Sequence, residues 1–245
     1  MNYNWNWGIF LQQVSSSDHT FLDWMFIGLG WTVAVSLTAW LIALLFGLVM
    51  GTLRTVPNRR VAMIGTIWVE IFRNIPILVQ LFLWFFVVPE LLPRDLSMWV
   101  KQDMPAKEFI TAAVALGFFT SARVAEQVRA GIQSLPRGQR NAGLALGFTQ
   151  AQTYRHVILP MALRIIIPPL TSEFMNTFKN SAVSFAIGVW DLTFVSRQMV
   201  EESGGQVIET LTVATLLYFL CAFAANRLML LIERRTRVPG LIASH

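Results

Sequence analysis

Five long apolar segments constrain the fold of this chain more than any other feature. They run from about residue 24 to 50, 64 to 88, 109 to 128, 165 to 189 and 211 to 232. Each is close to the ~20 residues that a helix needs to cross the hydrocarbon core of a bilayer. Only 13% of the residues are charged, about half the usual content of a soluble domain. The segments therefore predict an all-α integral membrane protein, with residues 1–245 forming a single transmembrane domain of about five helices.

The basic residues predict which side of the membrane each loop occupies. Arginines gather after the first segment, after the third and in the tail, where Arg234, Arg235 and Arg237 lie. The two intervening loops hold most of the acidic residues, and basic loops stay in the cytoplasm. We therefore expect the N-terminus outside and the C-terminus inside. Residues 1–23, with Trp5 and Trp7, are expected to lie at the outer interface. The net charge of +5 is explained by this topology, so no nucleic-acid partner is inferred.

A polar insert at residues 137–160 separates the third and fourth segments. Gly147 interrupts its helical pattern, and Thr149 with Gln152 has the spacing of a capping box. The pattern predicts two short helices around a glycine break, with Gly143 allowing a close backbone approach. Pro160 is expected to end the second helix. The apolar stripe indicates either a surface anchor for the loop or a docking face for a soluble partner; its members are Leu144, Phe148, Ala151, Arg155 and Ile158.

Several ionisable residues fall inside the predicted spans, where charges are costly and usually face a cavity or a partner. Glu70 and Arg73 are three residues apart, as are Arg123 and Glu126, so pairing within each helix is one interpretation. The other is a translocation path. Arg123 is the strongest candidate because a guanidinium binds a carboxylate with two hydrogen bonds. Arg73, Lys179 and Glu126 are further charged candidates, and Asn176 and Asn180 are polar ones that could instead bond between helices.

Proline and glycine positions add local expectations. Pro76 lies within the second segment and is expected to bend it, because proline removes a backbone donor. Pro168 and Pro169 are expected to mark the start of the fourth helix. Gly47 and Gly51 are four residues apart, a spacing typical of close helix packing.

The chain lacks the common catalytic and nucleotide-binding motifs. It has no G-x-x-x-x-G-K-[ST] loop, so we expect no ATP site of the P-loop type. It also has no H-E-x-x-H helix and no G-x-S-x-G turn. A transport protein that performs no chemistry is therefore favoured over a membrane enzyme. An ATP-independent secondary transporter or channel remains an alternative.

The insert resembles the conserved motif of ABC importer permeases, which is E-A-A, three residues, G, nine residues, I, any residue and L-P. Here Asn141, Ala142, Gly143, Gly147, Leu159 and Pro160 stand at the matching offsets, with Asn141 replacing the acid. Other segments are similar to the polar amino acid branch of that family: Glu70–Pro76 with Gln80, Glu126–Ile132, Pro136–Gln139 and Lys179–Ala182. In that branch an aromatic residue usually stands where Arg123 does. Trp5–Phe10, Arg54–Arg59 and Pro89–Pro93 are most similar to its glutamate/aspartate members.

This resemblance implies a type I ABC importer permease, multi-pass in the bacterial inner membrane and surrounded by lipid. Two cytoplasmic ATP-binding subunits would hold ATP-Mg, while this chain binds no cofactor itself. A periplasmic amino acid-binding protein and a second permease, identical or different, would complete the importer. Acidic amino acids are the expected substrates, with neutral or basic ones as the alternative. The residues expected to contact the ATPase are Asn141, Ala142, Gly143, Gly147, Phe148, Arg155, Leu159 and Pro160.

Overall fold

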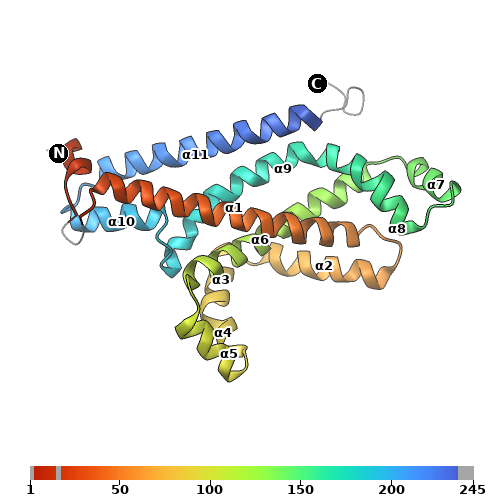
Figure 1. The fold of residues 1–245 in the computed structure, drawn as a ribbon, viewed down its shortest axis with the longest axis horizontal. Helices are drawn as coiled ribbons and strands as arrows, with labels where there is room; N and C mark the ends of the chain where they lie inside the picture. The colour runs from red at the N-terminus through yellow and green to blue at the C-terminus, as the bar shows by residue number, and fades with distance from the viewer. Residues whose placement is uncertain (1–2, 15–17, 237–245) are drawn as a thin grey trace. The chain divides into compact units, whose positions relative to one another are not determined.

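A computed structural model describes residues 3–14 and 18–236, and within these ranges the chain forms helices and no named strand (Figure 1). Four helical stretches are long and apolar enough to cross a membrane: Phe21–Leu53, Lys107–Gln133, Gln150–Ile187 and Val207–Arg235. A fifth is counted if the bent pair Arg59–Asn74 and Ile77–Leu91 forms one span. The predicted all-α membrane class is confirmed. Arg237 of the basic tail and residues 1–2 and 15–17 of the N-terminal segment lie outside the described residues.

The helices follow one another along the chain, from η1 to α11. Their bounds are η1 Trp7–Leu11, α1 Phe21–Leu53, α2 Arg59–Asn74, α3 Ile77–Phe82, η2 Leu83–Val87, α4 Val88–Leu91, α5 Arg94–Met98, η3 Trp99–Asp103, α6 Lys107–Gln133, α7 Arg137–Ala145, α8 Gln150–Thr153, η4 Tyr154–Ile158, α9 Leu159–Ser181, η5 Ala182–Ile187, α10 Leu192–Glu202 and α11 Val207–Thr236.

The chain divides into two compact units, which are described separately. Unit 1 comprises residues 1–39, 76–116 and 177–224. Unit 2 comprises residues 40–75, 117–176 and 225–245.

Unit 1 begins with the N-terminal segment and the first half of α1. Thr20 caps α1: its hydroxyl accepts from the Asp23 amide at 3.2 Å, and Asp23 accepts in return from the Thr20 amide at 2.9 Å. These reciprocal bonds satisfy two donors that a helix start otherwise leaves open. The buried Glu209 carboxylate holds the preceding segment, because it accepts from the Tyr3 hydroxyl and, at 2.7 Å, from the Asn6 amide.

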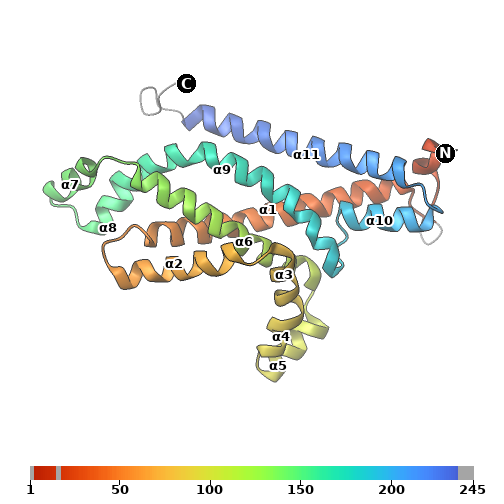
Figure 2. The ribbon, with the colours of Figure 1, turned by 180° about the vertical axis from the view of Figure 1, so that it is seen from behind.

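Helix α10 packs closely on the first half of α1 (Figure 2). A Cβ at Gly28 would lie only 3.1 Å from the Asp191 carbonyl oxygen. The fully buried Thr32 hydroxyl accepts from the Leu192 amide at 3.0 Å and donates to the Gly28 carbonyl at 2.9 Å. A glycine and a small hydroxyl residue therefore let the two helices meet without leaving buried polar groups unpaired.

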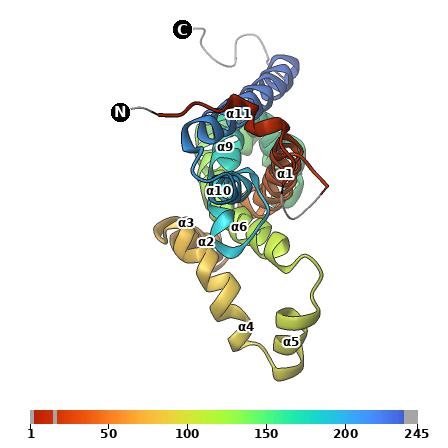
Figure 3. The same cartoon turned by 90° about the vertical axis from the view of Figure 1, so that its left-hand side faces the viewer.

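Helix α5 lies beside α4 in unit 1 (Figure 3). An ion pair of 2.6 Å between Lys101 Nζ and Glu90 Oε1 joins η3, the segment after α5, to α4. The side chains are 35% and 66% exposed, so solvent limits what the pair contributes to stability.

In unit 2 the second half of α1 packs against α6, and α2 packs against α1 (Figure 1). A Cβ at Gly47 would lie 2.4 Å from Val124, and one at Gly51 would lie 2.6 Å from the Ala125 carbonyl oxygen. Both distances are shorter than real Cβ contacts, so only glycine fits. The predicted packing role of this glycine pair is confirmed.

One expectation about proline is confirmed and one is wrong. The second apolar segment bends at Pro76 as expected, and the bend breaks the helix: α2 ends at Asn74 and α3 begins at Ile77. Ile75 is extended, with φ −98° and ψ 129°, as expected for a residue that precedes proline. Pro168 and Pro169 do not start a helix but lie inside α9. The chain tolerates them because α9 is a long span whose other turns are intact, although each proline removes one backbone donor.

The glycine packing in unit 2 gives the first prediction. Gly51→Val should lower the thermal unfolding midpoint of the purified protein, because the added side chain collides with α6 and overpacking costs about 1–3 kcal/mol. The control is Gly30→Val, also in α1, where a Cβ meets nothing within 4 Å. Equal midpoints for the two variants would contradict the packing role.

Asp191 is a buried carboxyl at the N-cap of α10. Its side chain is 1% exposed, and Oδ1 accepts from the Phe194 amide at 2.8 Å. Within the described residues, Oδ2 has no hydrogen-bond partner. Burial raises the pKa of this carboxyl from 3.8 to about 7, although the backbone amides of Phe194 and Thr193 oppose the shift. The folded state therefore holds a proton that the unfolded state releases at lower pH.

This raised pKa predicts a pH dependence of stability. Between about pH 4 and pH 7 the folded protein keeps the Asp191 proton and the unfolded chain does not, so the free energy of unfolding should fall as pH rises and then level off. The loss between pH 5 and pH 8 should be on the order of 2 kcal/mol. Asp191→Asn keeps a capping oxygen but cannot ionise. It should raise the thermal midpoint at pH 8 and flatten the profile. A lower midpoint at pH 8 would refute this account.

Candidate functional site

A charged cavity of about 630 Å³ lies in unit 2. Its walls come from α2, α6 and α9. They consist of Arg73, Arg123, Glu126, Gln127, Arg129, Ala130 and Glu173. Three of the predicted path residues, Arg73, Arg123 and Glu126, are therefore brought together around one space.

Glu126 is the centre of an ionic cluster on this cavity. Its Oε1 lies 2.7 Å from Arg54 Nη1 and 3.4 Å from Arg73 Nη1. Its Oε2 lies 2.9 Å from Arg129 Nη2 and 3.0 Å from Arg129 Nε. One carboxylate thus faces three guanidinium groups, and the cluster carries a surplus of positive charge. A cavity with such a wall favours an anionic ligand.

Arg123 and Glu173 face each other across the same cavity. Arg123 Nη1 lies 3.8 Å from Glu173 Oε2, a long contact, and the side chains are 45% and 12% exposed. The guanidinium also lies 5.1 Å from the centre of the Phe119 ring, within the range of a cation–π contact. The long ion pair leaves donors of Arg123 directed at the cavity. Arg123 is therefore held in place while it remains able to bind a further carboxylate.

The in-span charges do not pair as expected. Glu70 accepts from the Asn74 amide group at 2.8 Å rather than pairing with Arg73. Glu126 pairs with Arg54, which follows α1, with Arg73 of α2 and with Arg129 of its own helix α6, and Arg123 contacts Glu173 of α9 instead. Neither expected pair forms: Glu70 bonds to Asn74 within α2, while Arg73 and Arg123 have their ionic partners on other helices. Sequence spacing cannot reveal such partners.

The remaining predicted path residues lie on α9. Asn176 belongs to unit 2 and is half-buried, three residues beyond Glu173. Lys179 and Asn180 belong to unit 1, where Lys179 is exposed and Asn180 is half-buried. Glu173, which also lines the cavity, is not among the path residues predicted from the sequence. Its spacing from Asn176 on one helical face was the available signal.

The coupling region, residues 137–160, has the predicted helix, glycine break and helix. Helix α7 ends at Ala145, and Gly147 has a φ of +83°, which glycine adopts without a steric penalty. Thr149 and Gln152 form the predicted capping box of α8. A Cβ at Gly143 would lie 2.8 Å from Thr153 Cγ2, so the close approach expected at Gly143 is confirmed.

The predicted apolar stripe divides into an exposed and a buried part. Leu144 and Phe148 are 43% and 38% exposed, and Leu146 between them is 77% exposed. Ile158, at the other end of the stripe, is only 5% exposed. The interruption expected at Gly147 is confirmed, because α7 ends at Ala145 and Gly147 has a positive φ. What remains is a compact exposed apolar tip with Leu144, Leu146 and Phe148. Asn141, Ala142 and Arg155 are also exposed.

Pro160 does not end the element before the fourth span, contrary to expectation. Helical structure continues from α8 through the π-helical turn η4 into α9, which begins at Leu159. Pro160 directly follows η4, whose π-helical turn closes where the Leu159 amide donates to the Tyr154 carbonyl, so the missing donor of Pro160 falls where the helical hydrogen-bond pattern changes. The wide turn of η4 gives the chain its entry into α9.

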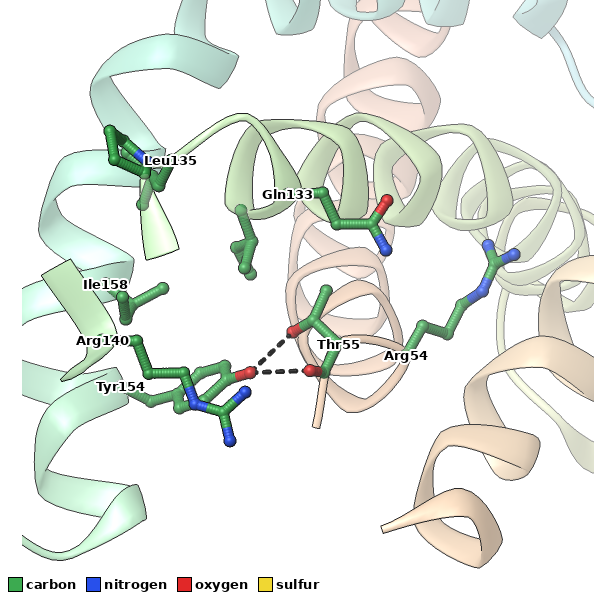
Figure 4. Close-up of a pocket in the computed structure, with 9 residues that line it drawn as sticks. Arg54, Thr55, Gln133, Leu135, Arg140, Tyr154 and Ile158 are labelled. Atoms are coloured by element: carbon green, nitrogen blue, oxygen red, sulfur yellow. Dashed lines mark hydrogen bonds between the residues drawn. The ribbon is translucent and has the colours of Figure 1, made fainter. Parts of the chain in front are cut away.

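A second cavity of unit 2, of about 400 Å³, lies beside the coupling region (Figure 4). The Tyr154 hydroxyl donates to the Thr55 carbonyl oxygen at 2.8 Å and lies 3.3 Å from Thr55 Oγ1. Tyr154 is 8% exposed. This hydrogen bond ties the coupling region to the loop that follows α1, directly next to Arg54 of the ionic cluster. Within the described part of the chain, no group of three or more His, Cys, Asp or Glu side chains could hold a metal ion.

Comparisons with known proteins agree with this architecture. A family described as the inner membrane component of binding-protein-dependent transport systems matches residues 43–238. The chain is 48% identical to the glutamate/aspartate import permease protein GltJ of Escherichia coli (strain K12), over 98% of both chains. It is 33% identical to GltK of Escherichia coli O157:H7, a glutamate/aspartate import permease protein, over 88% of this chain and 94% of that one.

Solved structures share the fold. The crystal structure of an amino acid ABC transporter with histidines matches with a TM-score of 0.73 and 30% identity, over 88% of this chain and 95% of that one. An inward-facing MetNI methionine ABC transporter matches with a TM-score of 0.68 at 23% identity, over 89% and 98% of the two chains. The predicted permease fold, the inner-membrane location and a role in transport rather than catalysis are confirmed. This chain belongs to the family of inner-membrane permease components of binding-protein-dependent ABC importers.

Proposed function

We propose that this chain forms the membrane pathway of an ATP-driven importer of acidic amino acids. The observation that carries the proposal is the cavity of unit 2, in which the Glu126 charge is already satisfied and Arg73 and Arg123 still face open space. The similarity to GltJ supports the same substrate class. GltJ is named a glutamate/aspartate import permease protein, and this chain matches 98% of it at 48% identity.

The cavity walls match the charges of such a substrate. An acidic amino acid presents two carboxylates and one ammonium group. Arg123 and Arg73 offer planar guanidinium groups that bind carboxylates with paired hydrogen bonds. Glu173 offers a carboxylate for the ammonium group. Glutamate would then replace the long Arg123–Glu173 contact with one interaction on each side. Lys179, Asn176 and Asn180 are proposed as further polar positions along the path.

The partners follow from the importer architecture. Two cytoplasmic subunits would hold ATP-Mg, and this chain would bind no cofactor itself. A periplasmic amino acid-binding protein would deliver substrate, and a second permease would complete the pathway. The assignment of a different permease as partner is supported by the similarity to both GltJ and GltK. In this arrangement the N-terminus lies in the periplasm and the C-terminus in the cytoplasm.

The coupling region is proposed to dock on the ATP-binding subunit. Its exposed apolar tip, with Leu144, Leu146 and Phe148, has no cover within the described chain. Apolar side chains on a turn outside the bilayer are typical of a protein contact. The residues proposed at this contact are Asn141, Ala142, Gly143, Gly147, Phe148, Arg155, Leu159 and Pro160. The Tyr154–Thr55 hydrogen bond would transmit a movement of the coupling region to Thr55 and the neighbouring Arg54.

Replacement of Arg123 tests the substrate class. Arg123→Tyr should reduce uptake of radiolabelled glutamate and aspartate at limiting concentration by about tenfold or more, since a charge-assisted hydrogen bond contributes about 1.5–3 kcal/mol. Arg123→Lys keeps the positive charge but not the planar guanidinium group, so its uptake should lie between that of the unsubstituted protein and that of Arg123→Tyr. Arg164→Tyr is the control, because Arg164 is exposed and lines neither cavity. Undiminished glutamate and aspartate uptake by Arg123→Tyr would refute the role of Arg123. Preferential uptake of neutral amino acids by the unsubstituted protein would refute the substrate class.

Replacement of Gly147 tests the docking contact. Gly147→Asp places a side chain and a charge on the positive-φ residue beside the exposed tip. The variant should reach the membrane at the wild-type level but should lose most of the ATP-binding subunit in co-purification. Gly138→Asp adds the same charge in α7, where a Cβ meets nothing within 4 Å, and should retain the subunit. Normal assembly of Gly147→Asp would place the docking contact elsewhere. A chain that transports without any ATP-binding subunit would favour a secondary transporter.

A further inference from the structure

The cavity beside the coupling region lies where two spans end. Thr55 stands two residues beyond the end of α1, and Gln133 is the last residue of α6. Figure 4 shows the side chains around it: Arg54, Thr55, Ile132, Gln133, Leu135, Pro136, Arg140, Tyr154 and Ile158. Both helices are candidate membrane spans, and the cavity lies at their ends rather than midway along them. Lipid headgroups meet membrane-spanning helices toward their ends.

The hydrogen-bond acceptors in this cavity are already in use. Gln133 Oε1 accepts from Arg129 Nη1 at 2.6 Å, and the Thr55 carbonyl oxygen accepts from the Tyr154 hydroxyl at 2.8 Å. The Gln133 amide nitrogen and the Arg140 guanidinium remain as donors. Arg140 forms no ion pair with any described residue. A wall that offers donors and few acceptors selects a ligand rich in acceptor oxygens.

The charge balance points to an anion. Arg54, which lines the cavity, shares the single carboxylate of Glu126 with Arg73 and Arg129. Arg140 adds a further positive charge, and no acidic residue lines the space. Phosphate oxygens suit such a site because guanidinium groups bind them with paired, charge-assisted hydrogen bonds.

The rest of the lining is apolar and buried. Ile132, Leu135 and Ile158 are 8%, 9% and 5% exposed. The small part of each side chain that faces the cavity would stay in water beside a free inorganic ion, whereas a phospholipid would place its glycerol and the first methylenes of its chains against it. The combination of donors, positive charge and apolar wall therefore fits an amphiphile with an anionic head.

We propose that this cavity binds the phosphate headgroup of an anionic phospholipid, such as phosphatidylglycerol. Arg140 and the Gln133 amide contact the phosphate oxygens, and Arg54 contributes its remaining charge. The bound headgroup bridges the ends of α1 and α6 to Arg140 of α7, and it thereby steadies the coupling region against the spans of unit 2. The site is separate from the charged substrate cavity and does not depend on which substrate is transported.

Native mass spectrometry of the assembled transporter in detergent tests this site, with phosphatidylglycerol or phosphatidylcholine added. The first phosphatidylglycerol should bind about tenfold more tightly than phosphatidylcholine, as expected for one charge-assisted contact. Arg140→Gln should remove most of that preference, and Arg140→Lys should keep part of it. Arg164→Gln, which removes an equal charge from an exposed position on α9, should leave the preference unchanged.

A photoreactive phosphatidylglycerol provides the second measurement, in membranes that contain the complete transporter. It should crosslink to peptides from residues 132–140 or 154–158, and Arg140→Gln should reduce that crosslink. Equal binding of the two lipids, or an equal effect of Arg164→Gln, would overturn the proposal. Displacement of phosphatidylglycerol by inorganic phosphate at millimolar concentration would assign the site to a free anion instead. Loss of the ATP-binding subunit from Arg140→Gln with unchanged lipid binding would assign it to that subunit.

Discussion

The ionic cluster around Glu126 is the constraint on which the rest of unit 2 depends. Its carboxylate receives Arg54 from the end of α1, Arg73 from α2 and Arg129 from α6. Three guanidinium groups would repel one another without it, and a partly buried charge that loses its partner is strongly destabilising. The cluster therefore joins three helix segments while it leaves the neighbouring cavity positively charged. A single arrangement thus joins the helices and gives the cavity the positive wall on which the proposed preference for an anionic substrate rests.

The same cluster links the charged cavity of unit 2 to the coupling region. The Tyr154 hydrogen bond to Thr55 reaches the residue next to Arg54, and Arg54 holds Glu126 on the wall of the charged cavity. A movement of the coupling region therefore has a short covalent and hydrogen-bonded route to the cavity. If Arg54 moves away from Glu126, less of the negative charge of Glu126 is neutralised, and the cavity becomes less favourable for an anion. This is a physical route by which docking at one end could alter substrate affinity at the other.

Local features were predictable because they depend on neighbours in the sequence. The capping box of Thr149 and Gln152, the left-handed Gly147 and the close packing at Gly47 and Gly51 are all set by residue type and spacing. Expectations failed where a distant residue or a neighbouring turn decided the outcome. Glu126 was expected to pair with Arg123 but meets Arg54, which is 72 positions away. Pro168 was expected to start a helix, yet it lies inside α9, and Pro160 was expected to end one, yet helical structure continues past it.

The sequence by itself determined the membrane class, the helical spans, the coupling motif and the identity of the charges placed within the spans. These follow from hydropathy, periodicity and local hydrogen bonding, which act over a few residues. Only the tertiary structure decided which charges meet, and so which of them face open space. It places Glu173 within 3.8 Å of Arg123, and it places the Gln133 amide and the Arg140 guanidinium, both hydrogen-bond donors, around one cavity. The physical reason is that a buried charge takes the partners that best offset its lost hydration, and for Glu126 and Arg123 these include residues far away in the sequence.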